Sequence, residues 1–168
     1  MRARDERDEA FRAFVRTSSA SLGRTAWFLT GDTDLAQDLV QEAYAKTYAS
    51  WSRVRQDDAV AYARRILVNT NIDRWRRRHG EVSLADADRL VEPSAEAEVD
   101  ERDRVARALG ELPRQQRTVV VLRYADDLSE KQVAALLGVS VGAVKSAASR
   151  GLAALRALPV WELEGELR

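Results

Sequence analysis

Residues 128–156 have the sequence LSEKQVAALLGVSVGAVKSAASRGLAALR, and this stretch sets the architecture of the second half of the chain. Ser129 and Gln132 have the spacing of a capping box, so a helix is expected to begin at Ser129. Gly138 is expected to end that helix, because glycine accepts the left-handed backbone that follows a helix C-terminus. Ser140 is placed to cap a second helix. Two helices joined by so short a turn predict a helix-turn-helix, whose second helix enters a DNA major groove.

The second of these helices is expected to have two different faces. Apolar residues recur at helical spacing, which predicts a buried stripe of Val144, Ala148, Leu152 and Leu155. The DNA-facing side is predicted to consist of small, polar and basic residues, namely Val141, Gly142, Lys145, Ser146, Ser149 and Arg150. The alternative is an ordinary α-helical hairpin in a protein core. The glycine turn, the two caps and the basic outer face together favour DNA binding.

The composition excludes several kinds of site. A chain of 168 residues forms one medium or two small domains. It has no cysteine for disulfides or thiolate metal sites, and its single histidine, His79, does not make a histidine-rich metal site. The sequence contains no glycine-rich phosphate loop and no nucleophile–base set. We therefore expect no catalytic residue, no metal and no cofactor.

The hydropathy pattern predicts a cytoplasmic protein that does not contact the membrane. No apolar run approaches the ~20 residues that a membrane-spanning helix needs. The N-terminal segment MRARDERDEAF is too charged for a signal peptide.

The formal net charge of zero conceals a strong pattern. The net charge is +4 over residues 1–79, −7 over residues 80–103, +5 over residues 104–158 and −2 over residues 159–168. Nucleic-acid affinity follows local positive charge density rather than the total. The pattern predicts two basic domains and an acidic flexible linker, with the boundaries 1–80 for the first domain, 81–101 for the linker, 102–158 for the second domain and 159–168 for a tail.

The fold class expected is all-α, because no segment shows a sustained two-residue alternation of apolar and polar residues. The run Val119–Leu122 is rich in β-branched residues but lies inside a helical pattern that begins at Pro113, a residue suited to a first helical turn. Besides the helix-turn-helix, helices are predicted at about 6–29, 34–50, 58–78 and 113–124.

The helix predicted over 34–50 separates an apolar face from an acidic one. The polar side brings together Asp34, Asp38, Gln41 and Glu42. A solvated outer face is one interpretation. A docking surface for a basic protein partner is the other, since the rest of this domain is basic.

The helix predicted over 58–78 ends in a basic cluster around an aromatic residue, Ile72–Arg78. Such a combination suits phosphates and an unstacked base. Alternatively Trp75 belongs to the core, and the arginines complement the negative end of the helix dipole.

The chain resembles bacterial RNA polymerase sigma factors of the extracytoplasmic-function type, in the sigma-70 family. The resemblance covers about residues 8–157, and the arginine-rich composition resembles that of actinobacterial members. The segments that carry it are DLAQDLVQEAYAKTY (34–48), ARRILVNTNIDRWRRR (63–78) and ALGELPRQQRTVVVLRYADDLSEKQVAALLGVSVGAVKSAASRGLAALR (108–156). Both halves in this order are far more specific than a helix-turn-helix alone.

The resemblance implies a role for each segment. The acidic face of Asp34, Asp38, Gln41 and Glu42 would bind the clamp helices of the largest subunit of core RNA polymerase. The segment of Asn69, Asp73, Trp75, Arg76 and Arg77 would meet the minus-10 element of promoter DNA, and the loop 52–58 would capture a flipped base. The helix from Val141 would recognise the minus-35 element.

The resemblance implies two further partners. The C-terminal domain would bind the flap of the second-largest polymerase subunit. An anti-sigma factor would be the second partner, but the sequence does not decide whether one exists. The acidic linker would pass near the active-site channel and the RNA exit path.

The sequence departs from the family pattern at four places. Val68 and Ala147 stand where arginine is expected in many relatives, so each is expected to remove a phosphate contact. Gln132 and Ala143 stand where glutamate and threonine are common. The tail from Pro159 lies outside the resemblance and is expected either to pack on the C-terminal domain or to bind a partner.

Two other classes of function remain as alternatives. A dimeric repressor or activator would use the same helix-turn-helix, but it leaves the acidic helix and the Trp/Arg-rich helix without a purpose. An all-helical metalloenzyme would need Glu-x-x-His ligand pairs, which a chain with one histidine lacks.

Overall fold

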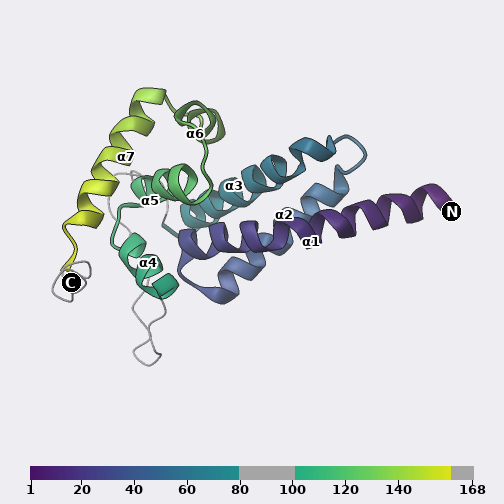
Figure 1. Ribbon diagram of the computed structural model, residues 1–168, viewed down its shortest axis with the longest axis horizontal. Coiled ribbons are helices and arrows are strands. Elements are labelled where there is room, and N and C mark those ends of the chain that lie inside the picture. Colours follow the sequence, from purple (N-terminus) through teal and green to yellow (C-terminus); the bar gives the residue numbers. More distant parts are fainter. Residues whose placement is uncertain (80–100, 160–168) are drawn as a thin grey trace, which may run out of the picture. The chain divides into compact units, whose positions relative to one another are not determined.

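The computed structural model describes residues 1–79 and 101–159, and every regular element in these two ranges is helical (Figure 1). The all-α prediction is confirmed. The predicted linker and tail, apart from Glu101 and Pro159, lie outside the described residues. Contacts divide the chain into two compact units, one formed by residues 1–26 and 33–80 and the other by residues 27–32 and 81–168.

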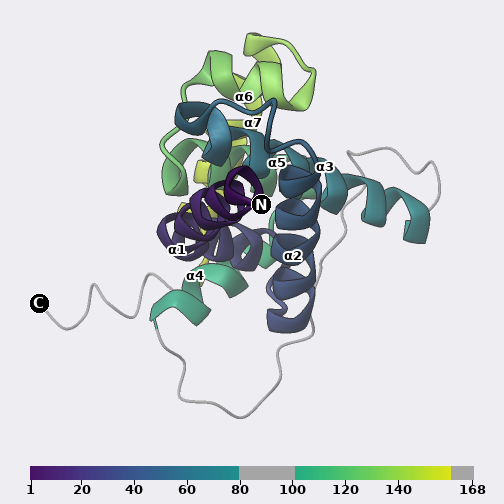
Figure 2. The ribbon, with the colours of Figure 1, turned by 90° about the vertical axis from the view of Figure 1, so that its right-hand side faces the viewer.

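The first unit is built from α1 (Arg2–Thr30) up to residue 26, α2 (Thr33–Ala49) and α3 (Ala59–His79), and the last turn of α1 belongs to the second unit. α1 is followed by Gly31, whose φ of 64° is the left-handed conformation that glycine adopts without strain. A single turn of 3₁₀-helix, η1 (Gln56–Asp58), leads into α3. α2 packs along α3 and meets α1 through side chains such as Ser18 and Tyr44 (Figure 2). The side chains buried in this unit include Leu22, Leu39, Ala43, Ala63 and Leu67.

An aromatic cluster joins the N-terminal half of α1 to the end of α2. Phe11 and Phe14 of α1 meet Tyr44 and Tyr48 of α2, with ring centroids 5.0 to 6.3 Å apart. Trp51, just after α2, packs on both phenylalanines at 5.1 and 5.2 Å. Edge-to-face contacts dominate, the arrangement that the ring quadrupoles favour.

The second unit contains α4 (Glu101–Gly110), α5 (Arg114–Val120), a π-helical turn η2 (Val121–Ala125), α6 (Glu130–Leu137) and α7 (Val141–Arg156). The β-branched run Val119–Leu122 is helical, as predicted, although its second half has π geometry. Pro113 stands at the N-cap of α5, one residue before the first helical turn in which it was predicted. The sequence pattern did not single out α4.

Both predicted helix caps of the helix-turn-helix are confirmed. The Ser129 hydroxyl accepts from the Gln132 backbone N–H at 3.1 Å, and the Gln132 side chain accepts from the Ser129 N–H at 2.8 Å. Gly138 ends α6 with φ at 66°. The Ser140 hydroxyl caps α7 by accepting from the Ala143 N–H at 3.0 Å. These bonds satisfy N–H groups that a helix start otherwise leaves without a partner.

Arg117 fastens α5 to the end of α4. Its guanidinium is buried, with the whole residue 2% exposed, and it donates to the backbone oxygens of Leu109 at 2.8 Å, Gly110 at 3.1 Å and Leu112 at 3.3 Å. The last carbonyls of a helix have no partner within the helix. The Leu109 oxygen also accepts from the Leu112 N–H at 3.1 Å, and Arg117 adds charged donors to the backbone oxygens at and just after the end of α4.

Gly151 lets α7 approach α5 closely. A Cβ atom at this position would lie 2.6 Å from Cγ2 of Val120, so close that either the stiff, β-branched Val120 side chain or the helix backbones must move. We expect Gly151→Ala to lower the free energy of unfolding, because overpacking costs ~1–3 kcal/mol and exceeds the gain of up to ~1 kcal/mol in helix propensity.

Gly23→Ala is the matched control, since a methyl group on Gly23 would have no atom within 4 Å and the residue is also inside a helix. We expect this variant to be stabilised by ~0.5–1 kcal/mol. Thermal unfolding followed by circular dichroism measures both changes. A Gly151→Ala protein that melts at or above the parent temperature would contradict the close approach of the two helices.

Candidate nucleic-acid and protein interfaces

The outer face of α7 consists of the residues that the sequence predicted. Gly142, Lys145, Ser146, Ser149 and Arg150 are exposed, whereas Val141 is half-buried. The opposite side of the helix is buried and consists of Val144, Ala147, Ala148 and Gly151. The capped N-terminal end of α7 thus presents hydroxyl, ammonium and guanidinium groups on one side, a set that can contact phosphates and base edges.

Lys145 is only loosely engaged within the protein. Its Nζ lies 3.8 Å from a carboxylate oxygen of Glu130 on α6, and its side chain is 63% exposed. An exposed ion pair of this kind contributes little to stability and is screened by salt. Lys145 is therefore available to an external anion.

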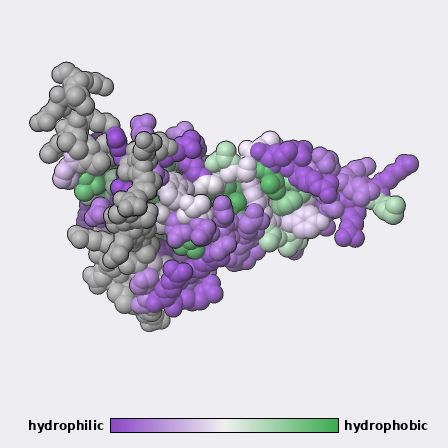
Figure 3. Space-filling view, turned by 90° about the horizontal axis from the view of Figure 1, so that it is seen from below, coloured by the Kyte–Doolittle hydropathy of each residue, from purple (hydrophilic) through white to green (hydrophobic). Residues whose placement is uncertain are grey.

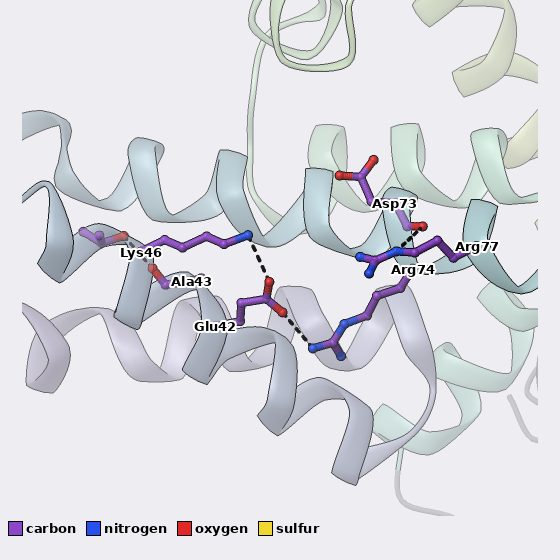
Figure 4. A network of polar contacts seen from close by, with 7 residues as sticks. Glu42, Ala43, Lys46, Asp73, Arg74 and Arg77 are labelled. Carbon is purple, nitrogen blue, oxygen red and sulfur yellow. Dashed lines mark hydrogen bonds and ion pairs between the residues drawn. The ribbon is translucent and has the colours of Figure 1, made fainter.

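The exposed stripe of α3 carries Asn69, Asp73 and Arg76, together with Tyr62 and Arg65 on the same side. These residues recur every three or four positions, the spacing of one helix face. Arg77 is exposed beside them, and its Nε donates to the backbone oxygen of Asp73 at 3.4 Å (Figure 4).

Trp75 does not lie on this stripe. It is 6% exposed, and its ring stacks on His79 at a centroid distance of 4.8 Å with 18° between the planes. Of the two interpretations that the sequence left open, burial favours the one in which Trp75 belongs to the core. The exposed aromatic residue of α3 is instead Tyr62.

A recess of about 470 Å³ lies between the segment that follows α2 and the first turn of α3. We call it the loop pocket. Its volume lies in the range of about 300–1,000 Å³ that small-molecule sites occupy. Basic, aromatic and polar side chains line it: Ser50, Arg53, Val54, Arg55, Asp58 and Tyr62.

The loop that the resemblance implied for base capture, 52–58, forms most of the wall of the loop pocket. Sequence reasoning missed Tyr62. Its spacing from Asn69 could have revealed it, because Tyr62 lies seven residues, or two helical turns, before Asn69 and therefore on the same helix face.

The acidic face of α2 is smaller than predicted. Asp34, Asp38 and Gln41 are exposed. Glu42 instead forms ion pairs at 2.9 Å with Lys46, in the same helix, and at 2.8 Å with Arg74 of α3 (Figure 4). Its charge is therefore balanced inside the unit, and its carboxylate joins α2 to α3.

The pKa of Glu42 reflects this environment. The hydrogen bond from Lys46 is the main reason why the pKa lies below its ordinary value, and the bond from Arg74 acts in the same direction, while partial burial opposes both. Because the pKa of Glu42 is lower in the folded protein than in the unfolded chain, the ion pairs stabilise the fold at pH values above the Glu42 pKa of the unfolded chain. This stabilisation is lost as the pH falls through the Glu42 pKa of the folded protein.

Two positions where the sequence departs from the family pattern are buried. Val68 is 1% exposed and Ala147 is 8% exposed. Neither side chain lies on the outer face of its helix, so burial argues against the expectation that each substitution removes a phosphate contact, which stays a prediction. Small or apolar residues stand there because the positions belong to the core.

Within residues 1–79 and 101–159, no group of histidine and carboxylate side chains is arranged to hold a metal ion. In the same ranges no single helix is long and apolar enough to cross a bilayer, and α6 and α7 meet that criterion only when they are taken together across a bend of 107°.

Known families match both units. Residues 14–81 match Sigma-70 region 2, and residues 102–155 match Sigma-70, region 4. The first match contains α2, the loop pocket and α3, and the second contains α4 to α7 except for their outermost residues.

Individual relatives agree with this result. The chain is 41% identical to the RNA polymerase sigma-E factor of Streptomyces antibioticus over 149 residues, which cover 87% of this chain and 82% of that protein. It is 34% identical to the ECF RNA polymerase sigma factor SigM of Mycobacterium tuberculosis, with 89% of this chain and 76% of that protein covered.

A solved structure is also similar. The sigma factor RpoE from Bartonella quintana, crystallised with the anti-sigma factor NepR, has a TM-score of 0.68 and 27% identity, with 87% of this chain and 94% of that chain covered. Sequence, matched families and fold thus agree that the chain belongs to the sigma-70 family, as an ECF sigma factor that serves RNA polymerase in promoter recognition and transcription initiation.

Proposed function

We propose that three surfaces of this sigma factor divide the work of promoter recognition. The outer face of α7 reads the minus-35 element, the α3 stripe with the loop pocket holds the opened minus-10 element, and the exposed face of α2 binds core polymerase. The observation that carries the proposal is the outer face of α7, where four polar or basic side chains lie exposed behind a serine cap: Lys145, Ser146, Ser149 and Arg150.

The minus-10 role rests on the chemistry around the loop pocket. Arg53 and Arg55 are exposed beside Tyr62, so cations and an aromatic face adjoin one recess. Single-stranded nucleic acids bind to such combinations, because cations meet the phosphates while bases stack on rings. Asn69, Asp73, Arg76 and Arg77 extend this polar surface along α3. Trp75 is buried and is left out of the proposed contacts.

The polymerase role rests on the open face of Asp34, Asp38 and Gln41. We propose that it docks a basic surface on the clamp helices of the largest subunit, without Glu42, whose charge Lys46 and Arg74 already balance. The C-terminal unit would meet the flap of the second-largest subunit. Catalysis belongs to the polymerase in this scheme, and the chain acts in the cytoplasm, where the polymerase is.

An anti-sigma factor is a further proposed partner. The Bartonella quintana relative was crystallised with NepR, an anti-sigma factor. A partner of this class would withhold the chain from polymerase until a signal releases it.

Reconstitution with core polymerase, followed by sequencing of transcript starts on genomic DNA, tests the proposed function. We expect transcripts to begin downstream of one shared pair of promoter elements only when the chain is present. A dimeric repressor would instead bind duplex DNA tightly without polymerase and would start no transcript.

Arg150→Ala tests the minus-35 assignment. A lost base contact costs ~1–3 kcal/mol and changes the preference at one position, whereas a lost phosphate contact weakens all sequences alike and reduces the salt slope by ~1. Binding of holoenzyme to a minus-35 library at several salt concentrations separates the two cases. Arg156→Ala, an exposed arginine in the last turn of the same helix, is the control. Equal binding by both variants would remove Arg150 from the interface.

A further inference from the structure

The N-terminal turns of α1 hold the end of α2, from which the wall of the loop pocket begins. Arg7 Nη2 donates to the backbone oxygen of Tyr48 at 2.8 Å, and the guanidinium lies 4.7 Å from the centre of the Tyr48 ring. The Tyr48 hydroxyl donates to Asp8 at 2.6 Å. Two neighbouring residues of α1 therefore fix the backbone, ring and hydroxyl of one residue about 40 positions away.

The region that follows the end of α2 is anchored from the same side. The backbone N–H of Trp51 donates to the oxygen of Tyr48 at 3.1 Å, so that this oxygen receives both Trp51 and Arg7. The Trp51 ring is 8% exposed and meets Phe11 of α1 nearly edge-on, at 5.1 Å and 85°. Tyr48 and Trp51 are thus two fixed points at the start of the loop.

Ser50, the first residue of the pocket wall, lies between these fixed points. Its backbone oxygen accepts from the N–H groups of Arg53 at 2.8 Å and Val54 at 3.2 Å, both of which also line the pocket. A displacement of Tyr48 or Trp51 would therefore move three wall residues together. The geometry of a binding site depends on such supporting contacts, and a site whose side chains are misplaced by about 1 Å binds or acts measurably less well.

The α1 residues that make these contacts, Arg7, Asp8 and Phe11, precede the region that matches Sigma-70 region 2, which begins at residue 14. The surface of this end of α1 is hydrophilic, as the right-hand end of the molecule in Figure 3 shows. Arg7, Asp8 and Phe11 are nevertheless half-buried, because they lie on the side of α1 that meets α2.

We propose that Arg7, Asp8 and Phe11 are positioning residues for the loop pocket. They hold Tyr48 and Trp51, fix the path of the loop and so set the sequence preference at the nucleotide that the pocket takes up. This inference rests on the proposed minus-10 role of the loop pocket.

The test measures sequence preference in holoenzyme on a promoter library randomised in both promoter elements. Tyr48→Phe removes only the hydroxyl that meets Asp8, and Asp8→Ala removes its acceptor. At the promoter position whose base enters the loop pocket, we expect both variants to reduce the ratio of binding to the best and the worst base by about tenfold, equivalent to about 1.4 kcal/mol. Preferences in the minus-35 element should stay unchanged. Asp8→Asn keeps an acceptor oxygen and should restore the preference.

Glu9→Ala is the matched control, because Glu9 lies next to Asp8 but pairs with Arg12 and Arg16 within α1. This variant should keep the parental preference at every promoter position. Equal losses at every promoter position in Tyr48→Phe and Asp8→Ala would show a general effect on folding and would overturn the positioning role.

Tyr62→Ala separates failure of this inference from failure of the proposed function. If Tyr62→Ala flattens the preference while Tyr48→Phe and Asp8→Ala leave it intact, the pocket assignment stands and the positioning role is overturned. If Tyr62→Ala also leaves every preference intact, the pocket assignment itself is wrong.

Discussion

Asp38→Arg combined with Gln41→Arg is expected to weaken binding to core polymerase on the order of a hundredfold, because like charges placed across an interface cost several kcal/mol and a hundredfold change corresponds to ~2.7 kcal/mol. Both residues are exposed on α2. Titration of labelled core polymerase with the variant measures the dissociation constant. Because the effect is electrostatic, it should diminish as salt is added.

Two comparisons make this result specific. Asp5→Arg with Glu6→Arg introduces cations on the exposed first turns of α1 and should leave polymerase affinity near that of the parent. Glu42→Arg should instead lower the melting temperature, since it places a third cation beside Lys46 and Arg74. Parental affinity in the Asp38/Gln41 variant would remove α2 from the polymerase interface.

Arg76→Ala combined with Arg77→Ala is expected to reduce formation of the open promoter complex on the order of a hundredfold, since each hydrogen bond to a charged group contributes ~1.5–3 kcal/mol. Both arginines are exposed at the end of α3, so truncation removes charge without opening a cavity. Permanganate reactivity of unpaired thymines in the minus-10 region measures the opening. Reactive thymines should appear only with holoenzyme and should fade in the double variant.

Arg12→Ala with Arg16→Ala is the control for this experiment, because it removes two exposed arginine side chains from α1. Flipping a base out of the duplex costs a few kcal/mol, which the holoenzyme must offset. The isolated chain is therefore expected to bind duplex promoter weakly. Tight duplex binding by a dimer of the free chain, with no opening after polymerase is added, would instead favour the repressor.

The local features of the fold were predictable from the sequence because their causes lie within a few residues of each other. The capping box joins Ser129 to Gln132, and Ser140 caps α7 through Ala143, three residues on. Gly138 needs only its own backbone angles to end α6. The outer face of α7 follows from helical periodicity alone. Local hydrogen bonds and periodicity depend on neighbouring residues, which the sequence shows directly.

Other assignments depended on which distant segments meet. The sequence placed Glu42 on an open acidic face, but Arg74, 32 residues away, pairs with it. Trp75 had two equally reasonable interpretations until its burial favoured the core. Val68 and Ala147 also proved to be core positions. A helical wheel gives the direction of a side chain but not the neighbour that it meets.

The all-α class, the helix-turn-helix and the family thus followed from the order of residues alone. The construction of the loop pocket did not, because Tyr62 joins Ser50 and Arg53 across a turn, and Arg7 and Asp8 reach Tyr48 across some 40 residues. Such contacts form when amphipathic helices bury their apolar faces against each other, and the register of that packing is set by the whole unit rather than by any one segment.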